Sequence, residues 1–216
     1  MIESGTGLIL RTRLLTETSL IVHWLTPEWG RIATVAKGAR RGNSPFAGKL
    51  DLFYVADFSI SRSRRSDLHP LREVKLHHTH EAIRADLTKL QQAAYAAACL
   101  ELATETETPL PELYALLRGY LEHLCAQTVS LQQTVFAFEL KFLRELGLEP
   151  DSAAARLSPG GKKILQTLLM ADWPEGARLK LSAAQTSELG QFLGHFVQTH
   201  LGRLPRGRAP ALGLNT

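Results

Sequence analysis

"SLIVHWLTPEWGRIATVAKG" (residues 19–38) decides the fold, because it holds two short strand patterns and the turn between them. Residues 19–26 are rich in apolar and β-branched side chains, as strands are. In P-E-W-G (27–30) a proline comes early and a glycine last, which is the chemistry of a tight turn. Residues 31–38 then alternate between two faces, which is the period of a strand.

Three more strand candidates surround this stretch. They are G-L-I-L-R-T-R-L-L (7–15), L-D-L-F-Y-V-A-D-F-S-I-S (50–61) and L-R-E-V-K-L-H-H-T-H (71–80). Turns and polar loops connect them, and no helical repeat interrupts them. Five strands of this length predict a small closed barrel. An SH3-like barrel fits the strand count nearly as well as a five-stranded Greek-key barrel.

From residue 81 onward the apolar period changes to that of helices. The pattern predicts helices over 81–105, 112–127, 131–147, 159–171 and 182–204. Ser158 is a candidate N-cap, and Ser182 with Gln185 has the spacing of a capping box. Strands first and helices afterwards indicate an α+β protein with a barrel domain (1–80) and an all-helical domain (81–216).

The charge of the chain is unevenly distributed. The 216 residues have a formal net charge of +4, but residues 1–80 hold 12 Lys+Arg against 7 Asp+Glu, a net of +5. A basic field confined to one domain makes polyanions the first candidate partners. The first residues lack a signal peptide, and no apolar run approaches the ~20 residues that span a bilayer. We therefore expect a cytoplasmic protein without a membrane partner.

Enzymatic motifs fail when they are tested residue by residue. In the loop after residue 36, Gly38 and Gly42 are too close for a nucleotide-binding phosphate loop, and Asn43 stands where that loop needs lysine. In S-P-G-G-K-K (158–163), Lys163 replaces the hydroxyl that would hold magnesium. On a strand, His78 and His80 share one face while His77 points away, and no carboxylate or cysteine pattern supplies a third metal ligand. The two cysteines form no C-x-x-C pair. We therefore expect no catalytic residue, cofactor or metal.

Nucleic-acid binding fits the two basic loops better. The candidate DNA-binding residues are Lys37, Arg40, Arg41, Lys49, Arg62, Arg64 and Arg65. Arginine forms bidentate contacts with phosphate oxygens, and glycine lets a backbone approach closely. Trp29 and Phe46, both placed in loops, are the candidate side chains for stacking on bases.

The first fifty residues also resemble a known family. The matching elements are a G-L-x-L-x-x-R opening, T-E-x-S-L, a T-x-E-x-G-R turn and V-A-K-G-A-R, in this order and without a gap. Together they resemble the amino-terminal segment of RecO, the bacterial recombination mediator family. Residues 138–151 resemble the helix before the family's variable region, and the stretch from 189 to 208 resembles its closing helix more loosely.

The resemblance implies an oligonucleotide/oligosaccharide-binding (OB) barrel followed by helices, and a non-enzymatic role. That role is to bind single- and double-stranded DNA, to anneal complementary strands and to help RecA load on DNA coated with single-strand binding protein (SSB). RecR and the acidic, phenylalanine-ended SSB tail are the implied protein partners, and the nucleoid is the implied location. By position, Lys37, Arg40 and Arg41 correspond to the family's basic barrel loop.

Two matters stay open at this point. The residues of the family's SSB-tail site cannot be assigned to positions of this chain. The helices that contain Arg118, Lys141 and Arg144 could supply an apolar hole rimmed by cations for that tail. Residues 148–181 contain no cysteine, so the zinc module of several family members is absent and this variable region has no predicted fold. The rival functions are an adaptor that docks acidic protein tails, with DNA binding incidental, and a nuclease.

Overall fold

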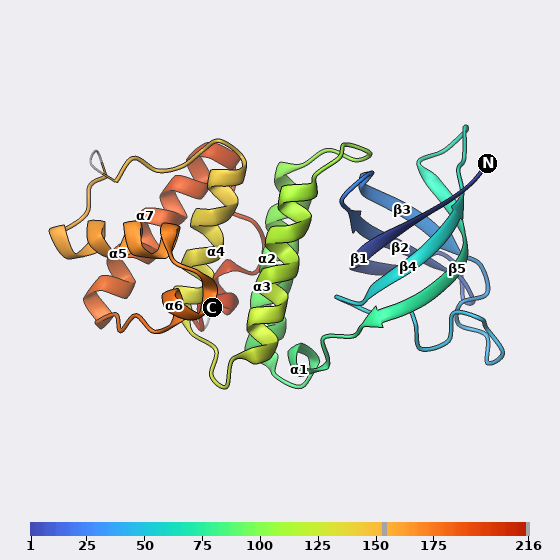
Figure 1. The fold of residues 1–216 in the computed structure, drawn as a ribbon, viewed down its shortest axis with the longest axis horizontal. Coiled ribbons are helices and arrows are strands. Elements are labelled where there is room, and N and C mark those ends of the chain that lie inside the picture. Colours follow the sequence, from blue (N-terminus) through green and yellow to red (C-terminus); the bar gives the residue numbers. More distant parts are fainter. Residues whose placement is uncertain (153–154, 215–216) are drawn as a thin grey trace. The chain divides into compact units, whose positions relative to one another are not determined.

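The computed structural model describes residues 1–152 and 155–214, and it confirms the predicted α+β class (Figure 1). The strands are β1 (Ile2–Leu14), β2 (Leu20–Thr26), β3 (Gly30–Ala36), β4 (Val55–Ser61) and β5 (Leu68–His78). The helices are α1 (Glu81–Arg84), α2 (Leu87–Ala103), α3 (Pro111–Ala126), α4 (Gln132–Glu145), α5 (Pro159–Met170), α6 (Trp173–Ala177), α7 (Ala183–Leu201) and α8 (Arg208–Ala211). In the described residues, no helix combines the length and apolar character needed to cross a membrane.

The five strands close into a barrel in the order β1-β2-β3-β5-β4. Only β3 and β5 run parallel, through residues 33–35 and 68–70. This is the Greek-key barrel of the OB fold, so the SH3-like alternative is wrong. β1 serves two neighbours: Leu8 lies opposite both Leu25 of β2 and Val55 of β4. A bulge between Ile9 and Arg11 bends the strand where it passes from one neighbour to the other.

Alternating side chains fill the inside of this barrel. Trp24 is fully buried, stacks on Phe58 with 4.3 Å between ring centroids, and donates a hydrogen bond of 2.9 Å to the Thr34 hydroxyl. The hydroxyl partner removes the cost of burying the indole N–H. The predicted strand at 50–61 begins only at Val55, because Phe53 adopts a left-handed backbone (φ 63°) just before it.

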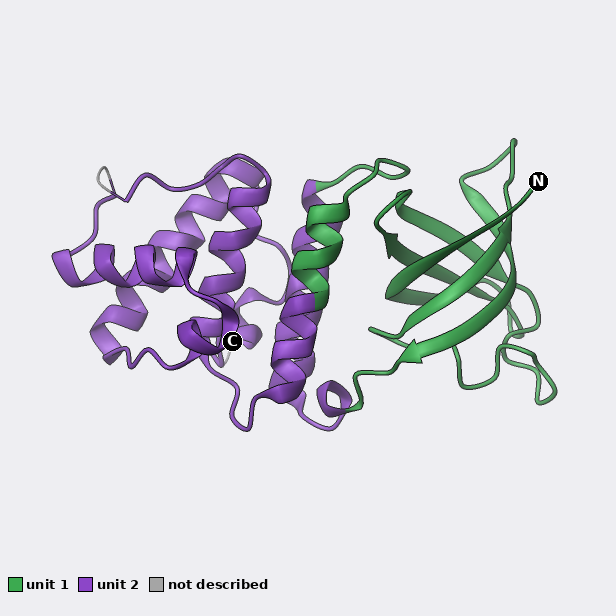
Figure 2. Ribbon diagram, viewed as in Figure 1, with its two compact units in different colours: residues 1–81, 104–118 green, residues 82–103, 119–216 purple. Residues whose placement is uncertain are grey.

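The chain divides by its internal contacts into two compact units, coloured separately in Figure 2. The first unit contains Met1–Glu81 and also Thr104–Arg118, a segment that the predicted boundary at residue 80 leaves out. We call residues 104–110 the arm. It lies along the start of β3, where Arg31 bridges to Thr106 and the Glu107 amide donates 2.9 Å to the Arg31 carbonyl. A Cβ on Gly30 (φ 63°) would lie only 1.7 Å from the Thr108 carbonyl oxygen, so this close approach requires glycine.

The second unit consists of the remaining helical residues, 82–103 and 119–216. Its central helix is α4, in which every residue from Thr134 to Leu143 is buried. Glu139 of α4 is 1% exposed and accepts two hydrogen bonds from Arg208 of α8, at 2.6 and 3.0 Å, and one from the Tyr95 hydroxyl. Burial raises the pKa of the Tyr95 hydroxyl far above its usual value, and the Glu139 charge adds to that rise. The ion pair therefore ties the carboxyl-terminal helix to the centre of the unit.

Capping side chains predict where the helices begin better than the apolar period does. The predicted helix over 81–105 is interrupted, because the Asp86 carboxylate accepts hydrogen bonds from the amides of Thr88 and Lys89 and starts α2 afresh. The predicted cap at Ser158 and the capping box at Ser182 are confirmed. The variable region, apart from residues 153–154, which lie outside the described residues, contains α5 and the short α6.

Candidate nucleic-acid interface

The outer surface of β1, β2 and β3 is the first part of the candidate interface, and we call it the basic face. Residues directly opposite one another on neighbouring strands share a face of the sheet. One row across this face is Arg13, Ile21 and Val35, and the next row is Arg11, His23 and Ala33. Arg13 is exposed, and the other five side chains are half-buried. In these two rows the cations therefore stand on β1 and apolar or neutral side chains cover β2 and β3, while Arg31 lies at the next position of β3 on this face.

A hollow of about 370 Å³ lies at the end of this face. Its lining comes from the β1–β2 turn and from the start of the loop after β3. The lining residues are Leu15, Thr16, Thr18, Ser19, Val35, Lys37, Gly38 and Arg41. Lys37 and Arg41 are exposed there, beside threonine hydroxyls. Two cations, hydroxyl donors and a glycine backbone are groups that hold a phosphate oxygen.

Backbone hydrogen bonds fix the two segments that form this hollow. The Gly38 amide donates 3.3 Å to the Ser19 hydroxyl, and the Arg40 amide donates 3.0 Å to the Thr18 carbonyl. The Arg40 guanidinium also donates 2.9 Å to the Glu17 carbonyl, so Arg40 fastens the β1–β2 turn to the loop. Gly38 has φ 67°, a conformation that glycine adopts without strain. These bonds therefore join the start of the loop to the β1–β2 turn.

The pKa of His23 reflects the positive charge of the basic face. Burial, and after it the charges of Arg11, Arg13 and Arg31, together lower the pKa of His23 to about 4. The imidazole is therefore neutral at pH 7. The strand register, with Arg11 opposite His23 and Arg13 one same-face position further along β1, agrees with this effect of their charges.

The second basic loop, between β4 and β5, lies toward the other end of β3. Arg62 donates to Glu3 at 3.1 Å and to Glu107 at 3.2 Å, and its guanidinium lies 5.4 Å from the Trp29 ring. His69, 2% exposed, accepts from the Ser63 amide through Nδ1, and its Nε2 lies 2.8 Å from Glu107. We call these residues the clamp. Arg62 is thus paired with two carboxylates, and its predicted contact with DNA stays a prediction.

Arg64 and Arg65 of the same loop are exposed. β5 starts opposite Ala33 and runs parallel to β3, so this loop lies near the start of β3, whereas Lys37 follows its end. The seven residues of β3 place the two loops about 20 Å apart at roughly 3.3 Å per residue. In OB folds, the loops at the two ends of the β2–β3 face flank the bound oligonucleotide. The structure thus places these cations at opposite ends of one face.

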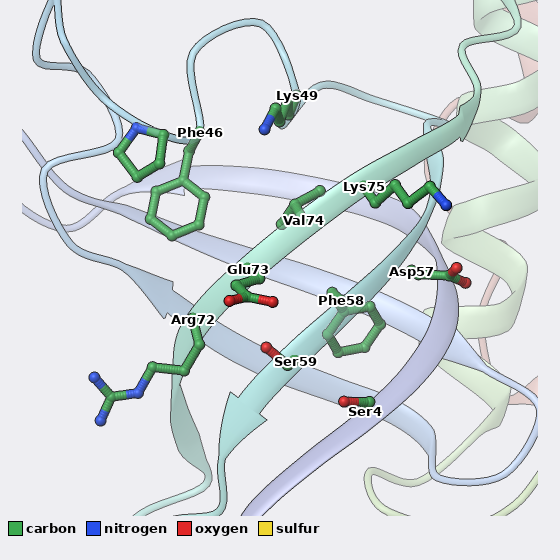
Figure 3. A pocket seen from close by; sticks show the side chains of 11 residues that line it. Ser4, Phe46, Lys49, Asp57, Phe58, Ser59, Arg72, Glu73, Val74 and Lys75 are labelled. Carbon is green, nitrogen blue, oxygen red and sulfur yellow. The ribbon is translucent and has the colours of Figure 1, made fainter.

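Lys49 lies apart from both groups. It lines a different hollow of about 430 Å³, whose other charged side chains are Asp57, Arg72, Glu73 and Lys75 (Figure 3). Asp57 accepts hydrogen bonds from Thr6 (2.6 Å) and from His77 (2.7 Å), which lower the pKa of its carboxyl. Because acids and bases are mixed in this hollow, it suits a polyanion less well than the basic face does.

Both predicted base-stacking aromatics are corrected by the structure. Phe46 is 6% exposed and belongs to the barrel core, because the loop after β3 folds back over the barrel. Trp29 is half-buried, packs edge-on against Phe58 at 6.0 Å and carries Arg62 on its ring. Neither ring face is presented to a base.

The three cations predicted to rim an SSB-tail hole do not form one surface cluster. Lys141 is 8% exposed and donates to the carbonyls of Leu169 (3.1 Å) and Ala171 (2.7 Å) inside the helical unit. Burial lowers its pKa, and nearby Arg144 lowers it further. Arg118 belongs to the first unit and lies 6.0 Å from the Tyr114 ring. The predicted rim is therefore wrong for Lys141.

Comparison with known proteins identifies the family. A model of the recombination protein O amino-terminal region matches residues 1–80, and one of its carboxyl-terminal region matches residues 84–154 and 149–209. The chain belongs to the RecO family. Similar curated proteins include the "DNA repair protein RecO" of Rhodopirellula baltica, 34% identical over 144 residues, and that of Bacillus pumilus, 33% identical over 151 residues.

These alignments cover only part of each protein. They take in 67% and 70% of this chain, but only 53% and 58% of the two relatives. A third relative, from Alkaliphilus metalliredigens, aligns over 94% of this chain and 96% of its own length at 24% identity. Among residues 1–152 and 155–214, no three His, Cys, Asp or Glu side chains gather as a metal site.

Sequence reasoning missed Arg11 and Arg13 as members of the basic face. The signal was present: the two arginines are two residues apart in a strand pattern, which puts both on one side of the sheet. The predicted DNA-binding cations all come from loops, so Arg11 and Arg13 of the strand are left out. Which strand lies beside them became visible only with the pairing of β1 and β2.

Proposed function

We propose that this chain is a non-enzymatic mediator of recombinational DNA repair. It binds single- and double-stranded DNA through the barrel, anneals complementary strands and assists RecA loading on SSB-coated DNA, with RecR as a protein partner. The observation that carries the proposal is the basic face with Lys37 and Arg41 in a hollow at its end. The names of the family and of its relatives support the repair context.

The physical basis is contact with the DNA backbone. Cations that neutralise phosphates release counterions, and this gives affinity with little dependence on sequence. A surface that holds strands by their phosphates leaves the bases able to search for their complements. Annealing then follows from weak, salt-dependent binding of two strands and needs no bond to be broken.

A strand-annealing assay tests this function. Two complementary labelled oligonucleotides are coated with SSB, the full chain is added, and duplex formation is followed over a salt series. We expect the chain to accelerate annealing at low salt and to lose this effect as salt rises. An annealing rate equal to that without the chain would overturn the proposal, and so would cleavage of labelled DNA with Mg²⁺ or Mn²⁺.

A groove in the helical unit favours a second, compatible role in docking an acidic protein tail. Its volume is about 730 Å³, and its lining includes Phe136 of α4, Gly190 and Gly194 of α7, and Leu212. Arg208 lies at the same groove, with its Nη1 2.9 Å from the position of a Cβ on Gly194. After Glu188 the chain contains no Asp or Glu. Arg208 is already paired with Glu139, so an acidic SSB tail would rely on the apolar floor and on a lining that contains no Asp or Glu.

Filling the groove tests this second role. In Gly190→Leu the new side chain grows from a helix position where a Cβ would lie 3.7 Å from the Phe136 ring, an ordinary contact. We expect this variant to bind a fluorescent SSB-tail peptide more weakly and to bind DNA as the wild type does. Unchanged peptide affinity would exclude the groove.

A further inference from the structure

The middle of the basic face has a composition different from its border. Its side chains are Ile21 and His23 of β2 and Ala33 and Val35 of β3, and we call this set the strip. All four are half-buried and therefore partly open to solvent. Lys37 and Arg41 stand at one end of the strip, and Arg13 stands beside Ile21.

Within the described part of the chain, the His23 imidazole makes no hydrogen bond, ion pair or ring contact, although the charges of Arg11, Arg13 and Arg31 act on it. Burial and three arginine charges keep the ring neutral at pH 7, with its pKa lowered to about 4. A neutral imidazole offers a flat face, one donor and one acceptor, and it gains little from a phosphate. These are properties that suit a nucleobase.

The dimensions of the face agree with this use. Neighbouring strands lie about 4.8 Å apart, so Arg13 on β1 stands roughly one strand spacing from the strip and about two from Val35. A phosphate at Arg13 can therefore have its base over β2. The aromatic rings near this surface, Trp24 and Trp29, are buried or packed against Phe58, which leaves the imidazole as the ring on the strip.

We propose that the strip is the platform for the bases of bound single-stranded DNA, with the His23 ring stacking on one base while Arg13, Lys37 and Arg41 hold the backbone. This inference rests on the proposed DNA-binding function and goes beyond it, because it assigns a base contact to a protein held to bind the backbone. A base on His23 adds affinity without adding a neutralised phosphate.

Two oligonucleotides of equal length separate base contacts from backbone contacts. One is oligothymidylate, and the other carries abasic sites along its whole length, so both present the same phosphates. Affinity for each is measured by fluorescence anisotropy with the wild type, His23→Ala and His23→Phe. We expect His23→Ala to bind oligothymidylate about fivefold or more weakly, at the lower end of the range for one stacked base. His23→Ala should bind the abasic oligonucleotide unchanged, and His23→Phe should restore the affinity for oligothymidylate.

The salt dependence gives a second readout. Because the imidazole is neutral, His23→Ala should leave the slope of affinity against salt unchanged while lowering the affinity itself. An affinity of His23→Ala for oligothymidylate within twofold of the wild type would overturn the platform, and so would an equal loss on both oligonucleotides. If the wild type binds neither oligonucleotide, the proposed function fails instead. Wild-type binding to both, with His23→Ala unchanged, would reject the platform and leave backbone binding in place.

Discussion

Replacing Lys37 and Arg41 together with alanine should weaken single-stranded DNA binding and make it less sensitive to salt. The exposed cations along the basic face and its two flanking loops are Arg13, Lys37, Arg40, Arg41, Arg64 and Arg65. If each neutralises one phosphate, the slope of log affinity against log salt is about −4 for the wild type, at about −0.7 per contact. Removing two contacts should bring it to about −2.8. Between 50 and 200 mM salt, affinity should then fall roughly 50-fold instead of roughly 300-fold.

The control for this experiment is Arg72→Ala with Lys75→Ala. It removes the same two charges from the same barrel, but from the mixed hollow at Lys49. Long-range attraction falls equally in both variants, so a difference in slope reports direct contacts. Fluorescence anisotropy of a labelled oligonucleotide over a salt series measures both slopes. A wild-type slope in the Lys37→Ala/Arg41→Ala variant, or the same reduced slope in the control, would refute the placement of DNA on the basic face.

Three further predictions concern the stability of the fold. Glu107→Ala removes the carboxylate at Nε2 of buried His69, which keeps the Ser63 amide at Nδ1, and should lower the free energy of unfolding by about 1–3 kcal/mol in urea titrations, whereas Glu107→Gln keeps an acceptor and should cost under about 1 kcal/mol. Equal losses would contradict this account of the clamp. Arg208→Ala leaves the Glu139 carboxylate buried without its cation and should cost about 3–5 kcal/mol; a loss below about 1 kcal/mol in calorimetry would show that the pair is dispensable. The pKa of His23 lies near 4 in the folded chain against an ordinary 6.5, so the unfolded chain takes up the proton first and stability should fall as pH drops from 6.5 to 4. In His23→Gln that part of the decline should vanish from urea titrations at each pH, and an unchanged decline would count against the lowered pKa.

Local chemistry made most of the fold predictable. The β2 and β3 strands follow from alternation around the P-E-W-G turn, and the starts of α5 and α7 follow from Ser158 and Ser182. The strand pattern alone could not distinguish an OB barrel from an SH3-like one, because strand order depends on pairing between distant residues; only the family resemblance favoured the OB barrel. The break at Asp86 was hidden by a strongly helical stretch on both sides.

The site was predicted less completely than the fold. Lys37 and Arg41 do share a hollow, since they are neighbours in one loop. Their relation to Arg62 depends on Glu107, which lies 45 residues further along the chain and joins the barrel through the arm. Phe46 shows the opposite difficulty: a loop residue between glycines looks exposed, but the loop folds over the open end of the barrel core.

The arm has a consequence for the order in which the chain can fold during its synthesis on the ribosome. Because the barrel unit includes Thr104–Arg118, a ribosome that has released only the first 80 residues has delivered all five strands but not the segment that lies against Gly30. The arm can cover the start of β3 only after the whole of α2 has been synthesised, because α2 precedes the arm in the chain. Amino-terminal domains usually fold as complete units during synthesis. Here the first unit is finished only after part of the second has been made.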